Sequence, residues 1–430
     1  MHNLNSLALA AASLFATASA QACTQSGGNW YCNQVDAVSY LNFGTSGTYD
    51  RVTYMNEVTG ECKKDKTAYG GAIGPFDEEL SIHIRGPFSL KQFAFYTPAS
   101  ISKRDESGPS RRDLEERALA NVACPKANQT TDCAKTTGCT QVSFTPKNKT
   151  CYLKSTSAPL HPQDYIRGVR GAQLISPLGN NKATTPKTQP TFTRRSYYNS
   201  ASQISSGLTF LNNIGGGSFP GIWSPKFGNS LSYASPSGLL PALSPQILSD
   251  TVLPSTSEIS LFTALPCSPT HPCPYTRPSS VAYHGFSGAD KIFLFEFSMP
   301  HDYAGADMPA LWFLNAQIPR TQQYGGCNCW GNTDGCGELD VFEVLTKGEE
   351  RMLSSVHGHQ AATNPNWFVR PVRGTMKGAV VLRGREMHVK RLDDGFEFGT
   401  GLTGEEVEGL VAVGLPWLEE GRVAKMVLPN

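Results

Sequence analysis

The sequence predicts an all-β protein whose larger, C-terminal part is a two-sheet sandwich of the jelly-roll type. Three observations favour this class. Strand-like runs recur between clusters of Gly, Pro and Asn, no stretch keeps a helical period for long, and the chain is 10% aromatic with 41 glycines, which suits a β-rich fold. The runs span residues 37–43, 49–55, 79–86, 90–97, 259–265, 291–299, 337–345, 378–384 and 386–392.

Residues 1–20 have the pattern of a secretory signal peptide. An apolar run precedes Ala18-Ser19-Ala20, a small-residue cleavage pattern. No other stretch approaches the roughly 18 apolar residues of a membrane span, and the C-terminal sequence lacks a glycolipid anchor signal. We therefore expect a secreted protein, extracellular or in a cell wall, that is held there by binding.

The charge balance excludes two classes of partner. The chain has 37 Lys and Arg against 36 Asp and Glu, so it offers no field that attracts nucleic acid or an anionic membrane. We expect an uncharged ligand, no nucleic acid or membrane partner, no cofactor, and a monomer.

Composition divides the mature chain into five parts. Residues 21–100 are predicted to form a small glycine-rich β-domain, and 101–120 a charged linker that cannot fold alone. A cysteine module follows at 121–175, then a linker rich in Pro, Thr and Asn at 176–198. The sandwich domain takes 199–430.

The cysteine module holds four cysteines and two N-glycosylation sequons, whose asparagines must face solvent if they are used. The secretory context favours disulfides over metal sites. The segment GCTQVSFTPKNKTCYLK resembles a PAN or apple module, which implies binding to proteins or sugars. The equal alternative is a disulfide-linked insertion that binds no ligand. These residues are Cys124, Cys133, Cys139, Cys151, Asn128 and Asn148.

The other eight cysteines predict a disulfide between the N-terminal domain and the sandwich. Cys267 and Cys273 form a local pair. Three cysteines precede the module and three lie within residues 327–336, so neither group can close internally. The second group lacks CxxC spacing, which favours a disulfide-braced loop over zinc. The two groups are Cys23, Cys32 and Cys62, and Cys327, Cys329 and Cys336.

The most informative segment is GELDVFEVL, residues 337–345. Residues two apart in a strand share a face, so Glu338 and Asp340 point together while the apolar residues between them point the other way. Strict alternation sends Glu343 to the wrong side. We therefore predict a β-bulge between Asp340 and Glu343, which returns Glu343 to the acidic face.

This arrangement matches the chemistry of a retaining glycosidase. Across the bulge the two glutamates lie on the order of 13 Å apart at Cα. Side chains that lean inward bring the carboxyls to about 5–6 Å, near the separation at which one carboxylate attacks the anomeric carbon and the other protonates the leaving oxygen. Such crowding raises one pKa, so one acid stays protonated near neutral pH. The alternative, a solvent-facing strand that happens to carry three acids, fits poorly with the apolar residues around it.

These residues resemble a known family. Glu338, Asp340 and Glu343 match the E-x-D-x-x-E signature of glycoside hydrolase family 16, and PALW at 309–312 resembles that family's PA-x-W strand. Three segments are similar to a fungal cell-wall family of glycosyl hydrolases: MPALWFLNAQIPRTQQYGGCNCW, GCGELDVFEVL and the N-terminal VSYLNFGTSGTYDRVTYM. The resemblance implies an enzyme acting on β-1,3-glucan, with Glu338 as nucleophile, Asp340 as its tuning partner and Glu343 as acid/base.

Aromatic and polar residues near the motif are candidates for sugar binding. Trp312 and Trp330 flank it and are favoured as stacking platforms, whereas core filling is favoured for Tyr324 and Trp367. His357 is a candidate for a hydrogen bond to substrate or to the acid/base. The same holds for His359, although a surface-loop position is favoured for both. Asn315 and Gln317 are candidates for the cleft lining.

Two alternatives remain open from the sequence. A transglycosylase uses the same carboxylates but passes the sugar to a sugar acceptor instead of water. A non-catalytic glucan-binding wall protein keeps the sandwich, but it has no need for paired carboxylates. The intact three-acid motif favours the enzyme.

Overall fold

The protein is described from a computed structural model. The structure describes residues 23–99, 191–411 and 422–428, together with four strands between 120 and 169. The predicted signal peptide and most of both predicted linkers lie outside these residues. The chain divides into a larger unit, residues 1–99 with 188–430, and a smaller unit, residues 100–187.

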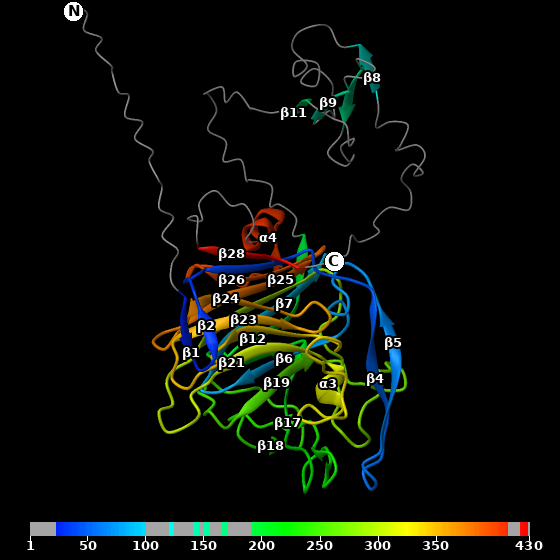
Figure 1. The fold of residues 1–430 in the computed structure, drawn as a ribbon, viewed down its shortest axis with the longest axis vertical. Coiled ribbons are helices and arrows are strands. Elements are labelled where there is room, and N and C mark those ends of the chain that lie inside the picture. Colours follow the sequence, from blue (N-terminus) through cyan, green and yellow to red (C-terminus); the bar gives the residue numbers. More distant parts are fainter. Residues whose placement is uncertain are drawn as a thin grey trace, which may run out of the picture. The chain divides into compact units, whose positions relative to one another are not determined.

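Two nine-stranded sheets build the larger unit (Figure 1). The first, called here the β7 sheet, contains in spatial order β13 (Ile204–Ser206), β12 (Phe192–Asn199), β7 (Ser89–Pro98), β20 (Lys291–Ser298), β25 (Met376–Arg383), β26 (Glu386–Leu392), β3 (Ala37–Leu41) and β28 (Val423–Val427), with β27 (Gly401–Leu402) beside β12. The second, called here the β22 sheet, contains β18 (Pro241–Ala242), β17 (Ser232–Ala234), β14 (Leu208–Asn212), β19 (Glu258–Thr263), β6 (Leu80–Arg85), β21 (Ala310–Asn315), β22 (Glu338–Glu343), β23 (Arg351–His357) and β24 (Ala362–Val369).

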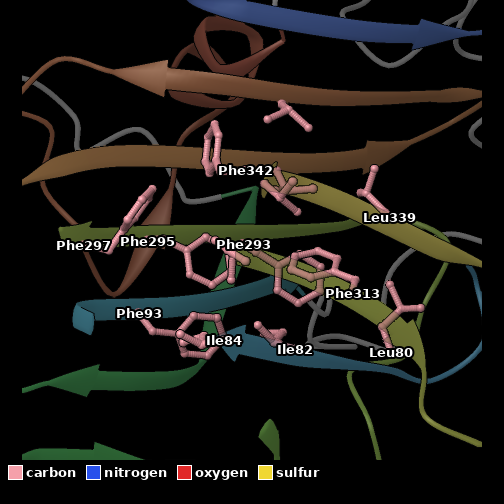
Figure 2. Close-up of a cluster of buried hydrophobic side chains, with 14 of the residues drawn as sticks. Leu80, Ile82, Ile84, Phe93, Phe293, Phe295, Phe297, Phe313, Leu339 and Phe342 are labelled. Carbon is pink, nitrogen blue, oxygen red and sulfur yellow. The ribbon is translucent and has the colours of Figure 1, made fainter. Parts of the chain in front are cut away.

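The core lies between these two sheets. Alternate residues of each sheet point inward, and their side chains form one hydrophobic cluster (Figure 2). Phe293 of β20 meets Phe313 of β21 at 4.7 Å between ring centroids, and Phe297 meets Phe342 of β22 at 5.5 Å. Each such fully buried ring stabilises the fold by roughly 1.5–3 kcal/mol. The prediction of an all-β protein is confirmed, and all nine predicted runs contain a strand; the jelly-roll strand order stays a prediction.

The N-terminal segment is not the separate domain that the sequence predicts for residues 21–100. Its strands β3 and β7 belong to the β7 sheet, and β6 lies between β19 and β21 in the β22 sheet. β3 pairs with β26 and β28, more than 300 residues away. Local patterning reveals a strand and its apolar face, but it carries no information on which distant strand completes the hydrogen bonds.

Shorter elements surround the sandwich. The hairpins are β1 (Thr24–Ser26) with β2 (Asn29–Tyr31), β4 (Gly47–Met55) with β5 (Cys62–Tyr69), and β15 (Trp223–Ser224) with β16 (Gly228–Asn229). The helices of the described chain are α3 (Gln317–Arg320) and α4 (Gly404–Leu410), the second opened by a capping box of Thr403 and Glu406. Within the described ranges, no helix has the length and apolar character of a membrane span.

The second predicted linker ends earlier than expected. Residues 192–198 of the predicted 176–198 linker form most of β12, which pairs with β7. Phe192, Ser196 and Tyr198 of this strand are buried. The Pro-rich composition therefore stops before residue 192, and the alternating pattern of a sheet strand replaces it.

The smaller unit contains a four-stranded antiparallel sheet in the order β11-β9-β10-β8. The strands are β8 (Ala120–Ala123), β9 (Gln141–Thr145), β10 (Thr150–Lys154) and β11 (Ile166–Val169). Cys151 lies in β10, while Cys124, Cys133, Cys139, Asn128 and Asn148 lie outside the described residues. The PAN-like identity, the disulfides and the glycosylation of this module stay predictions.

The disulfide predicted from the cysteine count is present. Cys62 at the start of β5 bonds to Cys327, 265 positions later, so one disulfide connects the N-terminal segment to the loop before β22. The predicted pair Cys267–Cys273 is also formed, and Cys23–Cys32 and Cys329–Cys336 complete the set in the described chain.

Replacing both Cys62 and Cys327 with Ser should lower the free energy of unfolding by about 2–4 kcal/mol, because among the disulfides of the described residues this bridge closes the longest loop and so restricts the unfolded chain most. The matched control replaces Cys23 and Cys32, which close a loop of only nine positions. This variant should lose less of the free energy of unfolding. Urea unfolding of the two double variants measures the difference. A greater loss in the Cys23/Cys32 variant would contradict this account.

Candidate active site

The three carboxylates of the motif lie on one face of β22, because the predicted bulge is present. The pairing of β22 with β21 shifts at Val341: Trp312 faces Asp340 while Leu311 faces Phe342. The pairing with β23 shifts between Asp340 and Glu343. The extra residue sends Val341 and Phe342 into the core together, and it returns Glu343 to the side of Glu338 and Asp340.

These carboxylates line a cleft of about 350 Å³ on the outer face of the β22 sheet. The cleft draws its side chains from β6, β21, α3, β22 and the segment 321–337, called here the Cys-rich loop. Its lining residues are Arg85, Trp312, Leu314, Ile318, Gln323, Tyr324, Gly325, Asn328, Trp330, Glu338, Asp340 and Glu343.

Glu338 is held by the Cys-rich loop. The indole N–H of Trp330 donates a hydrogen bond to its carboxylate. Burial, followed by the nearby charge of Asp340, raises the pKa of Glu338 to about 8, although Trp330 and His357 act in the opposite direction. The site therefore favours the protonated form of this carboxyl far more than water does.

Glu343 is held by the N-terminal segment. Arg85 of β6 donates from Nη2 to Glu343 Oε1 at 3.1 Å, and its Nε donates to the carbonyl of Met308 at 2.9 Å. Burial and Asp340 raise the pKa of Glu343 to about 7 against the opposing charge of Arg85. Since both glutamates have raised pKa values and feel each other's charge, they titrate as a pair that retains a proton near neutral pH.

Asp340 is paired with His357 of β23. Nε2 of the imidazole lies 3.0 Å from Asp340 Oδ2, and Nδ1 lies 2.7 Å from Asn332 Oδ1. The hydrogen bond to Asp340 raises the pKa of His357 above its ordinary value and outweighs the effect of burial. The sequence favoured a surface-loop position for His357, with a hydrogen bond to substrate or to the acid/base as the other candidate. In the structure the side chain ends β23 and contacts the central carboxylate of the motif.

The two favoured tryptophans both line the cleft, in different ways. Trp312 is only 6% exposed, stacks on His83 at 5.2 Å between centroids, and has the Arg85 guanidinium 5.7 Å from its ring centre. Trp330 is 47% exposed. Trp312 thus forms part of the floor of the cleft and Trp330 part of its wall.

Asn315 and Gln317 are not among the cleft residues, contrary to the sequence analysis. Both are buried, and their amides donate to Glu78 Oε2 at 2.9 and 3.0 Å. Gln317 also donates to the hydroxyl of Tyr49 at 2.8 Å. They anchor the end of β21 and α3 to the β4–β5 hairpin, because the chain turns into α3 directly after the strand.

Tyr324, for which core filling was favoured, is instead 65% exposed and lines the cleft. Trp367 and His359 lie outside the lining: Trp367 is part of β24, and His359 contacts the ring of Tyr69 at 6.3 Å. Arg85, Gln323 and Asn328 also line the cleft, although the sequence did not point to them. Alternation in β6 does place Arg85 on a polar face, but only the sheet order brings that face beside Glu343.

One group of metal-ligand side chains occurs in the described parts of the chain. It consists of Cys267, Cys273 and His284. The two cysteines form a disulfide, so they offer no thiolate to a metal.

Two family models match the chain, and their matches flank the smaller unit. The model described as cell wall protein YJL171C/Tos1, C-terminal, matches residues 190–410, and its N-terminal counterpart matches residues 36–98.

Several fungal proteins are similar over most of the chain, each named as a probable circularly permuted 1,3-beta-glucanase. TOS1 of Candida albicans is 38% identical over 96% of both chains, and TOS1 of Saccharomyces cerevisiae is 37% identical over 87% of this chain and 90% of its own. A protein of Arthroderma benhamiae is 35% identical over 96% and 97%. No solved structure matches. The chain therefore belongs to the Tos1/YJL171C family of cell wall proteins.

Proposed function

We propose that the protein is a retaining endo-β-1,3-glucanase that acts on cell-wall glucan. The observation that carries this proposal is the bulged strand β22, which presents Glu338, Asp340 and Glu343 on one face of a cleft, with both glutamates favouring protonation. The names of the relatives support the same substrate class.

In the proposed mechanism the two glutamates share one proton in the reactive form: Glu338, as a carboxylate, attacks the anomeric carbon, and Glu343 gives its proton to the departing oxygen. Because the pKa of Glu338 is raised further than that of Glu343, this reactive form is the less populated of the two singly protonated states in the free site. Glu343 then removes a proton from a water molecule, which releases the sugar from Glu338. Arg85 stabilises the carboxylate that Glu343 becomes after it gives up its proton. The negative charge of Asp340 disfavours the simultaneous ionisation of both glutamates. The hydrogen bond from His357 to Asp340 partly neutralises this charge and so weakens the repulsion.

The fold also supports the description of the relatives as circularly permuted. Residues 80–85 come more than 250 positions before the motif, yet β6 is separated from β22 only by β21 and contributes Arg85 to the cleft. We infer that the N-terminal strands are part of the catalytic sandwich, displaced in chain order. A truncation that removes them removes a wall of the site.

Incubation of the purified protein with laminarin tests the proposal, and the products separate its alternatives. If the only products are chains shorter than the laminarin supplied, the protein hydrolyses glucan. Products longer than the laminarin supplied indicate transfer to a sugar. Retention of glucan without any product indicates a binding protein.

Replacing Glu338 with Gln should reduce turnover of laminarin about a thousandfold or more without loss of folding. In the folded protein the pKa of Glu338 is raised from 4.5 to about 8, so its protonated form stabilises the fold below the lower value, and that contribution is lost as pH rises through the upper one. Gln keeps the neutral state. The variant should therefore melt at a higher temperature than the wild type near neutral pH, and the difference should shrink toward acid pH.

A matched control makes the same Glu-to-Gln change outside the cleft, at Glu408, which pairs with Arg383 on the surface. It should retain full activity. Wild-type activity in Glu338→Gln, or inactivity in Glu408→Gln without unfolding, would contradict the assignment of the nucleophile.

The pH profile of kcat/KM should move in opposite directions in two variants. Asp340→Asn removes a negative charge that raises both glutamate pKa values, so the profile should shift toward acid. His357→Gln removes a positive charge that lowers both pKa values, so it should shift toward alkaline pH. A shift of both variants in the same direction would exclude the electrostatic roles proposed for Asp340 and His357.

Stereochemistry tests the separation of the two glutamates. If they stand close enough for Glu338 to attack directly, two inversions give net retention. NMR of a fresh laminarin digest should then show the β-anomer before mutarotation. Initial release of the α-anomer would mean that water attacks directly, and that the carboxyls stand further apart.

A further inference from the structure

A second polar cluster lies in the same sheet, three strands from the catalytic carboxylates. Glu258 of β19 lies opposite Arg85 of β6, Arg85 lies opposite Ala310 of β21, and Ala310 lies opposite Glu343 of β22. Three inter-strand spacings separate the Cα atoms of Glu258 and Glu343 by about 14 Å. The next residue of β19, Ile259, belongs to the core, so Glu258 points to the cleft side of the sheet.

Glu258 is a mostly buried carboxylate surrounded by hydrogen-bond donors. Its Oε1 accepts from Gln323 Nε2 at 2.6 Å and lies 3.2 Å from His83 Nδ1, and its Oε2 accepts from the hydroxyl of Tyr324. Burial raises the pKa of Glu258, but the interactions with His83, Tyr324 and Gln323 outweigh it and hold that pKa below its ordinary value. Glu258 is therefore a fixed anion rather than a proton donor.

The hydrogen bond from Tyr324 fixes an exposed aromatic ring. The side chain is 65% exposed and lines the cleft, where a tyrosine without an anchor would sample several rotamers. Its hydroxyl is bound to Glu258, so the ring is held in place in the lining of the cleft. The function proposed above does not use this ring.

The backbone that carries Tyr324 is also braced. Asn328 donates from Nδ2 to the carbonyls of Gln322, Gln323 and Gly325 at 2.7, 3.3 and 3.0 Å. The disulfides Cys62–Cys327 and Cys329–Cys336 fix the loop directly after this turn. The Cys-rich loop thus presents two rings, Trp330 bound to Glu338 and Tyr324 bound to Glu258, each held by a carboxylate of the sheet.

We infer that Tyr324, with Glu258 and Gln323 behind it, forms a second sugar-binding subsite that receives a pyranose unit of the glucan away from the bond that is cleaved. The apolar face of a sugar ring packs on an aromatic face, and a ring whose orientation is already fixed loses little entropy on binding. Glu258 acts as a positioning residue for Tyr324. The identity of the ligand as β-glucan rests on the proposed function.

The test compares kcat and KM for β-1,3-gluco-oligosaccharides from the trimer to the heptamer. In the wild type, kcat/KM should rise once the chain is long enough to reach Tyr324. Tyr324→Ala should lower kcat/KM by about two- to tenfold on the long oligomers, through KM with kcat unchanged, and leave the shortest oligomer unaffected. The control Tyr303→Ala removes another exposed tyrosine, 81% exposed, that is not part of the cleft lining, and should match the wild type.

Two further variants separate the ring from its anchor. Tyr324→Phe and Glu258→Gln keep the ring but weaken its fixation. Each should therefore raise KM on long oligomers by less than Tyr324→Ala does, with the pH profile unchanged. A purely structural role for Glu258 would instead lower activity on all lengths alike and lower the melting temperature. Equal length dependence in Tyr324→Ala and the wild type would overturn the subsite.

Retardation in native gels containing laminarin distinguishes this inference from the proposed function. If the wild type is retarded but cleaves nothing, the proposed catalysis fails, and weaker retardation of Tyr324→Ala still supports the subsite. If the wild type is not retarded and shows no length dependence, the subsite is refuted. If the wild type cleaves laminarin and Tyr324→Ala is retarded equally, only the subsite is refuted.

Discussion

The extra residue at Val341 is the constraint on which the rest of the site depends. Strand β22 must bury Leu339, Val341 and Phe342 between the sheets and must also present three acids on its other face. A regular strand of period two cannot satisfy both demands over this sequence. The bulge satisfies both at the cost of interrupted pairing with β21 and β23. The apolar residues hold the strand in place, and the acids are positioned as a consequence.

The clustered acids are costly for the fold, and their surroundings show how that cost is limited. Both glutamates are buried enough that ionisation is disfavoured. Each nevertheless has one strong donor: Trp330 for Glu338 and Arg85 for Glu343. Asp340 has its own partner in His357. These donors come from three separate parts of the chain, so the ionisation of the carboxyls depends on the complete sandwich.

The Cys-rich loop and the N-terminal segment both contribute side chains to the lining of the cleft. The disulfide between Cys62 and Cys327 joins the β4–β5 hairpin to that loop. Asn315 and Gln317, although absent from the cleft, bind Glu78 and so tie the end of β21 to the same N-terminal segment. Rigid support behind a site keeps its contacts aligned without an entropy cost at each binding event. The buried amides are therefore part of the support of the cleft rather than of its surface.

The sequence by itself determined the all-β class, nine of the strands, the bulge between Asp340 and Glu343, and the need for one disulfide across the chain. Each of these follows from a local period, an apolar pattern or a count, which need no knowledge of distant neighbours. Only the tertiary structure decided that residues 37–98 supply strands to both sheets, that Arg85 reaches Glu343, and that Tyr324 is exposed while Asn315 is buried. The physical reason is that a strand offers hydrogen bonds on both edges and one apolar face whatever its neighbours are. The order of strands in a sheet is set by the packing of the whole core, and side chains from distant segments meet only after that order is fixed.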